Sequence, residues 1–134
     1  MLALLSALAI FLQSAAPGVT GVWKTQTDDG LIRIAPCGEA ICGFVAGSER
    51  LKAQPRQFDV RNRDQALRNR PILGLLMMRL KVQGANHWGN GWIYNPDDGG
   101  TYKASIELTK DDKVHLKGCI AAFLCKTQVW TRVS

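Results

Sequence analysis

Hydrophobic and polar residues alternate in short runs along most of this chain, and such alternation is typical of half-buried β-strands. The clearest run covers residues 88–108, which we interpret as one β-hairpin. On its first strand, Trp88, Trp92 and Tyr94 are expected to share one face. Its turn, residues 95–100, consists of asparagine, proline, aspartate and glycine, which favour a reversal of the chain.

Shorter runs of the same kind predict the other strands. These lie at residues 19–24, 31–36, 41–47, 73–82, 113–120 and 128–133. A chain with about eight short strands and almost no helix is predicted to be all-β, as an antiparallel barrel or sandwich. With 134 residues, 46% of them hydrophobic, it is long enough for one domain with a buried core.

A long segment, residues 48–71, interrupts the alternation. It contains seven basic and three acidic residues, so its local charge of +4 is most of the net charge of +6 of the whole chain. Residues 64–68 are compatible with a short helix, and the remainder is expected to be a long basic loop. Loops of this length inside a compact domain are often functional, and the positive charge favours an anionic partner such as a lipid head group.

The first sixteen residues carry no charge and are rich in leucine and alanine. This stretch is short for a membrane span and has the length of the apolar part of a signal peptide. We therefore expect residues 1–16 to be a signal peptide and residues 17–134 to be one mature domain, periplasmic or secreted from a Gram-negative bacterium. A buried core segment or a permanent anchor is the alternative. Export would separate the mature domain from nucleic acid and leave it peripheral to the membrane at most.

The four cysteines form two close pairs in the sequence, Cys37 with Cys42 and Cys119 with Cys125. Four cysteines allow three pairings, and we favour these two local disulfides because each pair flanks an expected chain reversal. The alternative is one zinc site with four thiolate ligands. It is disfavoured because the second pair exceeds the usual Cys-x₂₋₄-Cys spacing and because an oxidising compartment favours disulfides.

Several short motifs together resemble one known family. They are Gly21-x-Trp23, Cys37…Ile41-Cys42-Gly43, Arg70-Pro-Ile-Leu-Gly74, Trp88…Trp92-Ile-Tyr-Asn-Pro96…Tyr102 and Lys117-Gly…Thr127-Gln-Val-Trp-Thr-Arg132. The family is a group of exported bacterial proteins of unknown function with a lipocalin-like (calycin) β-barrel, and the likeness covers nearly all of the mature chain. One departure is Asn62-Arg63-Asp64, where family members commonly have Asn-Pro-Asp.

The resemblance implies an antiparallel up-and-down barrel whose interior is filled by side chains or holds one small ligand. In lipocalins an arginine on the last strand covers the tryptophan of the first strand. The resemblance therefore implies a cation–π contact between Arg132 and Trp23 that closes the base of the barrel. It brings no established reaction, ligand or set of catalytic residues.

Residues suited to catalysis or metal binding are few. The two histidines, His87 and His115, lack a metal-binding spacing, and no serine lies in a Gly-x-Ser-x-Gly motif. Asp97 and Asp98 belong to the hairpin turn, where carboxylates usually accept hydrogen bonds from backbone amides. A calcium site formed by these two residues and Asn95 is the alternative. We expect no enzymatic activity, no cofactor and no bound metal.

Two functions fit these observations. The first is binding of a small amphipathic or apolar ligand, with candidate residues Arg68, Arg70, Met78, Trp88, Trp92 and Tyr94. The competing interpretation is that the aromatic residues fill the core and that Arg70 pairs with Asp59 or Asp64 to pin the loop. The second function is interaction with the cell envelope, in which the basic loop contacts anionic lipid, cell wall or a protein partner. A barrel cavity of at least ~300 Å³ would favour ligand binding.

Cleavage of the signal peptide would leave a mature protein that begins near Pro17. N-terminal sequencing of the protein from its native host is expected to show this start, in an extracytoplasmic fraction. An intact Met1 on protein from the cytoplasmic fraction would contradict export.

Overall fold

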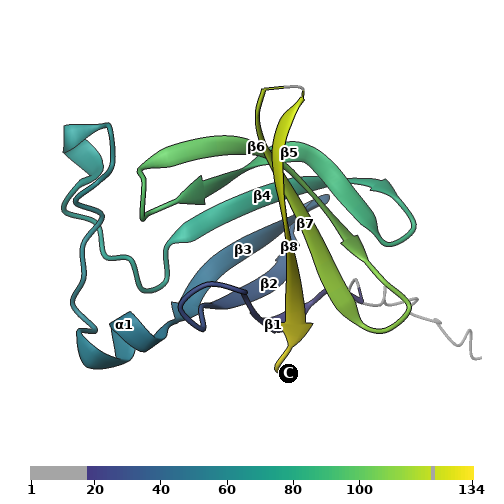
Figure 1. Ribbon diagram of the computed structural model, residues 1–134, viewed down its shortest axis with the longest axis horizontal. Coiled ribbons are helices and arrows are strands. Elements are labelled where there is room, and N and C mark those ends of the chain that lie inside the picture. Colours follow the sequence, from purple (N-terminus) through teal and green to yellow (C-terminus); the bar gives the residue numbers. More distant parts are fainter. Residues whose placement is uncertain (1–17, 122) are drawn as a thin grey trace, which may run out of the picture.

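The computed structural model describes residues 18–121 and 123–134, which form a closed antiparallel barrel of eight strands (Figure 1). Each strand pairs with the next along the chain, and the last pairs with the first. The strands are β1 (Gly21–Lys24), β2 (Leu31–Cys37), β3 (Ala40–Gly47), β4 (Leu76–Gly84), β5 (His87–Asn95), β6 (Gly100–Leu108), β7 (Lys113–Ala121) and β8 (Leu124–Arg132). The predicted up-and-down barrel is confirmed. The predicted signal peptide, residues 1–16, lies outside the described residues.

The core lies inside the barrel, on alternate residues of each strand. One inner layer runs across four strands, because Ile34 is opposite Gly43, Gly43 opposite Met78, and Met78 opposite Ile93. Ile34 and Met78 are completely buried. Burial of each large apolar side chain of this kind stabilises the fold by roughly 1.5–3 kcal/mol. The alternation in the sequence therefore supplies the inward-facing apolar residues whose burial stabilises the barrel.

The barrel closes where the short strand β1 meets β8. Trp23 is opposite Arg132 in this pairing, and the guanidinium lies 4.3 Å from the centre of the indole ring. Arg132 also donates hydrogen bonds to the backbone oxygens of Gly18 (2.6 Å) and Thr20 (3.1 Å) and to the carboxylate of Asp112 (2.7 Å). The contact inferred from the lipocalin resemblance is therefore present, and it joins three segments at the base of the barrel.

The hairpin of β5 and β6 forms, but the prediction that Trp88, Trp92 and Tyr94 share one face is wrong. Trp88 is opposite Ile106, whereas Gly91 is opposite Ala104, so β5 contains one extra residue between these pairs. This β-bulge places Trp88 on the core side and turns Trp92 and Tyr94 to the outer face.

Two residues explain the bulge in β5. Asn90 adopts a positive φ of 47°, which asparagine tolerates better than most residues. Gly91 is required because a Cβ atom there would lie 1.9 Å from the carbonyl oxygen of Arg79. The chain therefore approaches its neighbour more closely here than any side chain permits.

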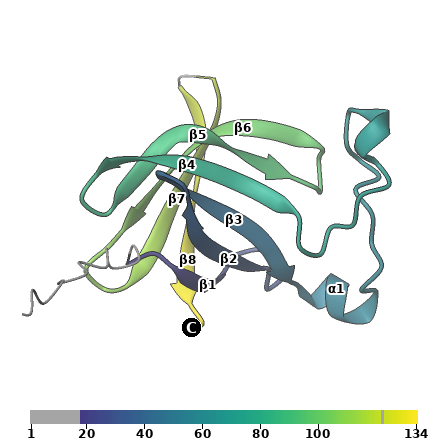
Figure 2. The same cartoon turned by 180° about the vertical axis from the view of Figure 1, so that it is seen from behind.

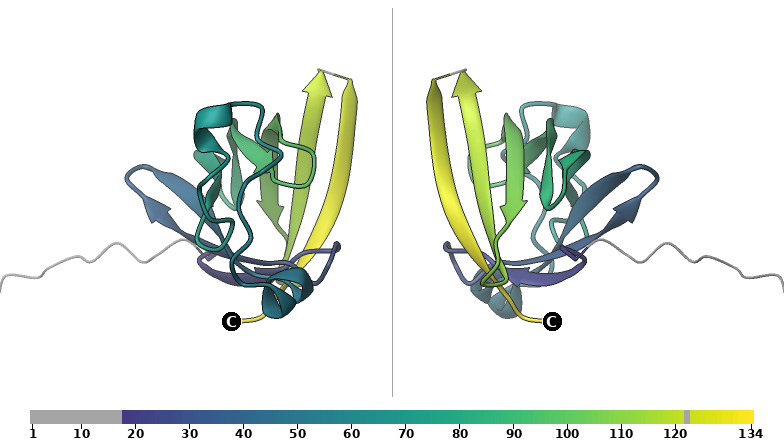
Figure 3. Two further views of the ribbon diagram at one scale, coloured as in Figure 1. Left: turned by 90° about the vertical axis from the view of Figure 1, so that its left-hand side faces the viewer. Right: turned by 90° about the vertical axis from the view of Figure 1, so that its right-hand side faces the viewer.

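Residues 48–71, the basic loop, stand at one end of the barrel and connect β3 to β4 (Figures 1 and 2). The loop contains the helix α1 (Glu49–Ala53), capped by the Ser48 hydroxyl, and a single 3₁₀ turn, η1 (Gln65–Leu67), near the predicted short helix. Viewed from that side, the loop passes in front of the barrel end (Figure 3, left). Within the described residues, neither helix has the length and hydrophobicity needed to span a bilayer.

Two strand boundaries differ from the sequence prediction. The strand expected at residues 73–82 begins only at Leu76, since Gly74 has a φ of 83° and turns the chain before it. The strand expected at residues 128–133 begins earlier, at Leu124. The added residues of β8 reach the open end of the barrel.

Both local disulfides are present. The first joins Cys37, at the end of β2, to Cys42, within β3, and the second joins Cys119 and Cys125, which are opposite each other in β7 and β8. The four sulfur atoms therefore belong to two separate hairpins, which does not fit the alternative of a shared zinc site.

Removal of the Arg132 charge tests how much the closure contributes to stability. Arg132→Met keeps an apolar chain over Trp23 but loses the cation–π contact and the hydrogen bonds, and we expect it to lower the free energy of unfolding by about 2 kcal/mol. Urea unfolding measures this. Arg79→Met, at an exposed arginine of β4, is the control and should change stability by less than about 0.5 kcal/mol. Equal stability of the two variants would contradict the closure role.

Candidate functional site

A cavity of about 550 Å³ opens inside the barrel, at the end that carries the basic loop. Apolar side chains from six strands line its inner wall: Ile32, Val45, Met77, Ile93, Leu116 and Trp130. Met77 is available to this wall because it is an extra residue in β4, between the pairs Phe44–Leu76 and Gly43–Met78. The volume lies well above the ~300 Å³ of the smallest ligand sites.

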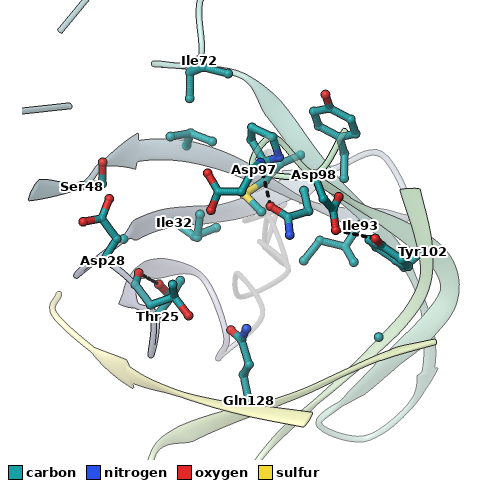
Figure 4. A pocket seen from close by; sticks show the side chains of 18 of the residues that line it. Thr25, Asp28, Ile32, Ser48, Ile72, Ile93, Asp97, Asp98, Tyr102 and Gln128 are labelled. Atoms are coloured by element: carbon teal, nitrogen blue, oxygen red, sulfur yellow. Dashed lines mark hydrogen bonds between the residues drawn. The ribbon is translucent and has the colours of Figure 1, made fainter. Parts of the chain in front are cut away.

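A few polar side chains interrupt the apolar wall. Figure 4 shows Gln128 projecting from β8 into the space between Thr25, Ile32 and Ile93. The amide oxygen of Gln128 accepts a hydrogen bond from the indole nitrogen of Trp130 (3.0 Å). Since the indole can only donate, this contact fixes the amide orientation and leaves its NH₂ group as a donor. Within the described part of the chain, that NH₂ group has no partner.

Charged residues gather at the mouth of the cavity. Lys126 alternates with Gln128 and Trp130 along β8 and borders the cavity. Arg50 and Arg61 border it from the basic loop. These three cations were not among the predicted site residues.

The β5–β6 turn contributes the two acidic residues for which calcium binding was the alternative. Asp97 accepts a hydrogen bond from Arg50 (3.3 Å), and its backbone oxygen accepts one from Arg61 (2.6 Å). Asp98 accepts from the Tyr102 hydroxyl (2.5 Å), a contact that raises the pKa of Tyr102. Both carboxylates thus fix the turn and the loop at the mouth (Figure 4).

A buried carboxylate holds the basic loop against the outer face of β5. The side chain of Asp59 is completely buried, and it accepts hydrogen bonds from Tyr94 (2.5 Å), Asn62 (2.8 Å) and Arg70 (2.8 Å). The Arg70 guanidinium also lies 5.3 Å from the centre of the Tyr94 ring. This set, which we call the Asp59 cluster, satisfies a charge that would be costly to bury alone.

The pKa values of the cluster follow from these contacts. Burial alone would raise the pKa of Asp59, but the hydrogen bonds from Tyr94, Asn62 and Arg70 and the Arg70 charge together hold it below its usual value. Burial, followed by the hydrogen bond to the Asp59 carboxylate, raises the pKa of Tyr94 to about 12. Asp59 is therefore ionised and Tyr94 neutral at physiological pH.

The predicted ligand-binding residues do not form one site. Tyr94 borders the cavity, whereas Met78 and Trp88 are buried in the core and Trp92 is half-buried on the outer face of β5. Arg70 belongs to the Asp59 cluster, as in the competing interpretation. Arg68 donates to the backbone oxygen of Asn62 (2.8 Å) within the same loop.

Comparison with known proteins agrees with this geometry. The sequence pattern of a bacterial family described as "Uncharacterized protein conserved in bacteria (DUF2147)" matches residues 21–132, which is most of the chain and all of the barrel. The chain belongs to this family. The prediction of an exported bacterial family of unknown function with a lipocalin-like barrel is thus confirmed as to family and fold.

A solved structure shows the same fold. It is titled "Protein HP1028 from the human pathogen Helicobacter pylori belongs to the lipocalin family" and superposes with a TM-score of 0.78. The alignment covers 86% of this chain and 82% of that protein, at 20% sequence identity. Likeness at this level of identity concerns the fold alone. A comparison with proteins of curated function found no significant match.

Replacing Asp59 by asparagine tests the clamp on the basic loop. Asp59→Asn keeps the shape but leaves Arg70 without its counter-charge, so the free energy of unfolding is expected to fall by about 2 kcal/mol or more at neutral pH. Because the native pKa of Asp59 is depressed, its contribution is complete above about pH 4, the ordinary carboxyl pKa, and disappears as the pH falls through the native value. The stability gap between the two proteins should therefore narrow in acid.

Urea unfolding at neutral and acidic pH measures this gap. Asp64→Asn is the matched control, because Asp64 lies exposed in the same loop and caps η1 with an oxygen that asparagine retains. If the wild type and Asp59→Asn are equally stable at neutral pH, or if their difference in unfolding free energy grows in acid, Asp59 does not hold the loop as an ionised carboxylate.

Proposed function

We propose that this protein binds a small amphipathic ligand whose apolar part occupies the barrel. The observation that carries the proposal is the cavity of about 550 Å³, apolar along its wall and polar at its mouth. Its volume is typical of small-molecule sites of ~300–1,000 Å³, which combine apolar walls with a few placed polar groups.

The wall and the mouth fit different parts of such a ligand. An aliphatic or aromatic body would contact Ile93, Leu116 and Trp130 and gain the free energy of leaving water. The NH₂ group of Gln128 offers one directed hydrogen bond to a ligand oxygen inside the barrel. A polar head would remain at the mouth, near Lys126 and Arg61, where it keeps contact with solvent.

A binding role without catalysis is part of the proposal. Of the three aspartates that border the cavity, Asp97 and Asp98 are bound to Arg50 and Tyr102, and Asp28 is a single exposed carboxylate of the turn between β1 and β2. Both histidines, His87 and His115, are exposed and lie outside the cavity lining. The supporting argument is therefore that the cavity wall offers shape and hydrophobic surface rather than paired reactive groups.

We place this activity outside the cytoplasm. Two disulfides in a small domain support this location, because thiols are kept reduced in the cytosol. A periplasmic binding protein for apolar or amphipathic molecules would carry them through water between the membranes or from the medium.

Filling the cavity tests the proposal. Gly118 lies on the inner wall, and a Cβ atom there would meet only Ile93, at 3.9 Å. Gly118→Phe should therefore place a ring in the cavity without disturbing the strand. Titration with a dansyl-labelled fatty acid is expected to show saturable binding to the wild type, weakened at least tenfold (~1.4 kcal/mol) in the variant.

The matched control is Gly84→Phe, at a glycine of β4 with no atom near its Cβ position. It should bind the probe like the wild type, and thermal unfolding should show that both variants fold. Undiminished binding by Gly118→Phe would place the probe outside the barrel. Native mass spectrometry of protein purified from its own host would then identify the natural ligand, and protein recovered without any ligand that also fails to bind amphiphiles would overturn the proposal.

A further inference from the structure

Large apolar side chains are exposed at the end of the β7–β8 hairpin. Ile120 is 70% exposed, Phe123 90% and Leu124 56%. We call these three residues the tip. The hairpin projects beyond the neighbouring strands (Figures 1 and 3), and the disulfide between Cys119 and Cys125 joins its two strands just behind the tip. Apolar residues on a projecting, covalently braced hairpin are not needed for the core of this barrel.

A second apolar group lies across the mouth from the tip. Phe58 and Val60 of the basic loop are 49% and 66% exposed. Both border the cavity mouth, as do Ile120 and Leu124, although these residues come from distant parts of the sequence. The tip, Phe58 and Val60 together form what we call the rim, an apolar edge on two sides of the mouth.

Cations surround the rim. Lys117 and Lys126 lie at the base of the tip, and Arg56, Arg61 and Arg63 flank the two apolar residues of the basic loop. All five are exposed.

Three acidic residues near the rim are already partnered. Asp59 is buried against Arg70, Asp97 accepts from Arg50, and Asp98 accepts from Tyr102. Asp28, which borders the cavity, and Asp64 of the basic loop are also exposed, but the five exposed cations outnumber these two carboxylates, so the charge around the mouth is positive.

We propose that the rim docks this protein on an anionic lipid bilayer, with the tip inserted among the lipids. The spacing along β8 fits such insertion. Lys126 is two residues behind Leu124, and at ~3.3 Å per residue its backbone lies ~7 Å behind that of Leu124. Interfacial segments bury their apolar side chains ~5–10 Å deep with cations at the level of the phosphates.

The arrangement favours a bilayer over a protein partner or a second copy of the chain. The apolar residues of the rim belong to two separate segments, the β7–β8 hairpin and the basic loop, with the cavity mouth between them. A protein interface, in contrast, needs a continuous, closely packed core. A fluid lipid surface adapts to separate insertion points. Docking in this orientation would also press the cavity mouth against the bilayer, so that an amphipathic molecule could enter the barrel without crossing open water.

Vesicle binding tests the docking directly. Co-sedimentation with vesicles of phosphatidylglycerol and phosphatidylcholine is expected to capture the wild type, whereas vesicles of phosphatidylcholine alone should capture little. Phe123→Ser with Ile120→Ser should weaken capture by about tenfold or more, since two large apolar groups stay out of the lipid. Val82→Ser, at a 59% exposed valine near the opposite end of the barrel, is the matched control and should leave capture unchanged.

Charge reversal tests the second half of the proposal. Lys117→Glu and Lys126→Glu should each weaken capture by about fivefold or more, because one cation near an anionic surface contributes ~1 kcal/mol. The control is Lys110→Glu, at the exposed β6–β7 turn away from the mouth. Added salt should weaken capture by the wild type in the same direction.

Several results would overturn the docking. These are equal capture by anionic and neutral vesicles, equal effects of rim and control substitutions, or a rim-dependent dimer in solution that binds no vesicles. Thermal unfolding of each variant shows that the fold is retained. Gly118→Phe, which fills the cavity and leaves the rim intact, should still bind vesicles, so failure of docking and failure of ligand binding are separable.

Discussion

The contact between Arg132 and Trp23 is the constraint on which this barrel depends. The β1 strand has only four residues and shares two residue pairs with β8, so the seam between first and last strands has few backbone hydrogen bonds. Arg132 compensates by stacking on the indole and by binding two backbone oxygens and a carboxylate. With the base fixed in this way, the opposite end can stay open and hold a cavity instead of a solid core.

The basic loop is held by a different device. Its buried Asp59 gathers Tyr94, Asn62 and Arg70, and this fixes the loop on the outer face of β5 rather than inside the barrel. The loop therefore borders the cavity without filling it. Arg70 neutralises the buried charge, while Arg50 and Arg61 bind Asp97 of the β5–β6 turn and lie at the mouth. The arginines of the basic loop thus have two roles. The one that Asp59 binds holds the loop in place, and the two that bind Asp97 lie at the surface around the cavity mouth.

The fold could be predicted from the sequence because its signals are local. Alternation marked the strands and close spacing marked the two disulfides, whereas the Trp23–Arg132 closure was inferred from the resemblance to lipocalins. The site could not be predicted, because it depends on which face each residue occupies. One extra residue at Asn90 reverses the faces of β5, and another at Met77 adds a side chain to the cavity wall. A count of alternating residues along the sequence does not detect such bulges. The glycine at position 91 is the one local sign of the bulge in β5, because a glycine inside a strand often marks one.

The predicted start of β8 was another reason why a residue of the site was missed. Beginning the strand at residue 128 left Lys126 in a turn, whereas the observed start at Leu124 puts it on the inner face with Gln128 and Trp130. A disulfide partner at Cys125 could have indicated the longer strand, because a cystine across neighbouring strands requires that both continue that far.

The bare inner wall at Gly118 has a consequence for the evolution of this family. Among the described residues only Ile93 comes within 4 Å of the Cβ position at Gly118, so the side chain at this position can change the volume of the cavity. A relative with a larger residue at this position could keep the same strands, closure and loop and would have a smaller cavity. Under the proposed function, single substitutions at this position would change which ligand sizes the barrel accepts while the architecture stays constant.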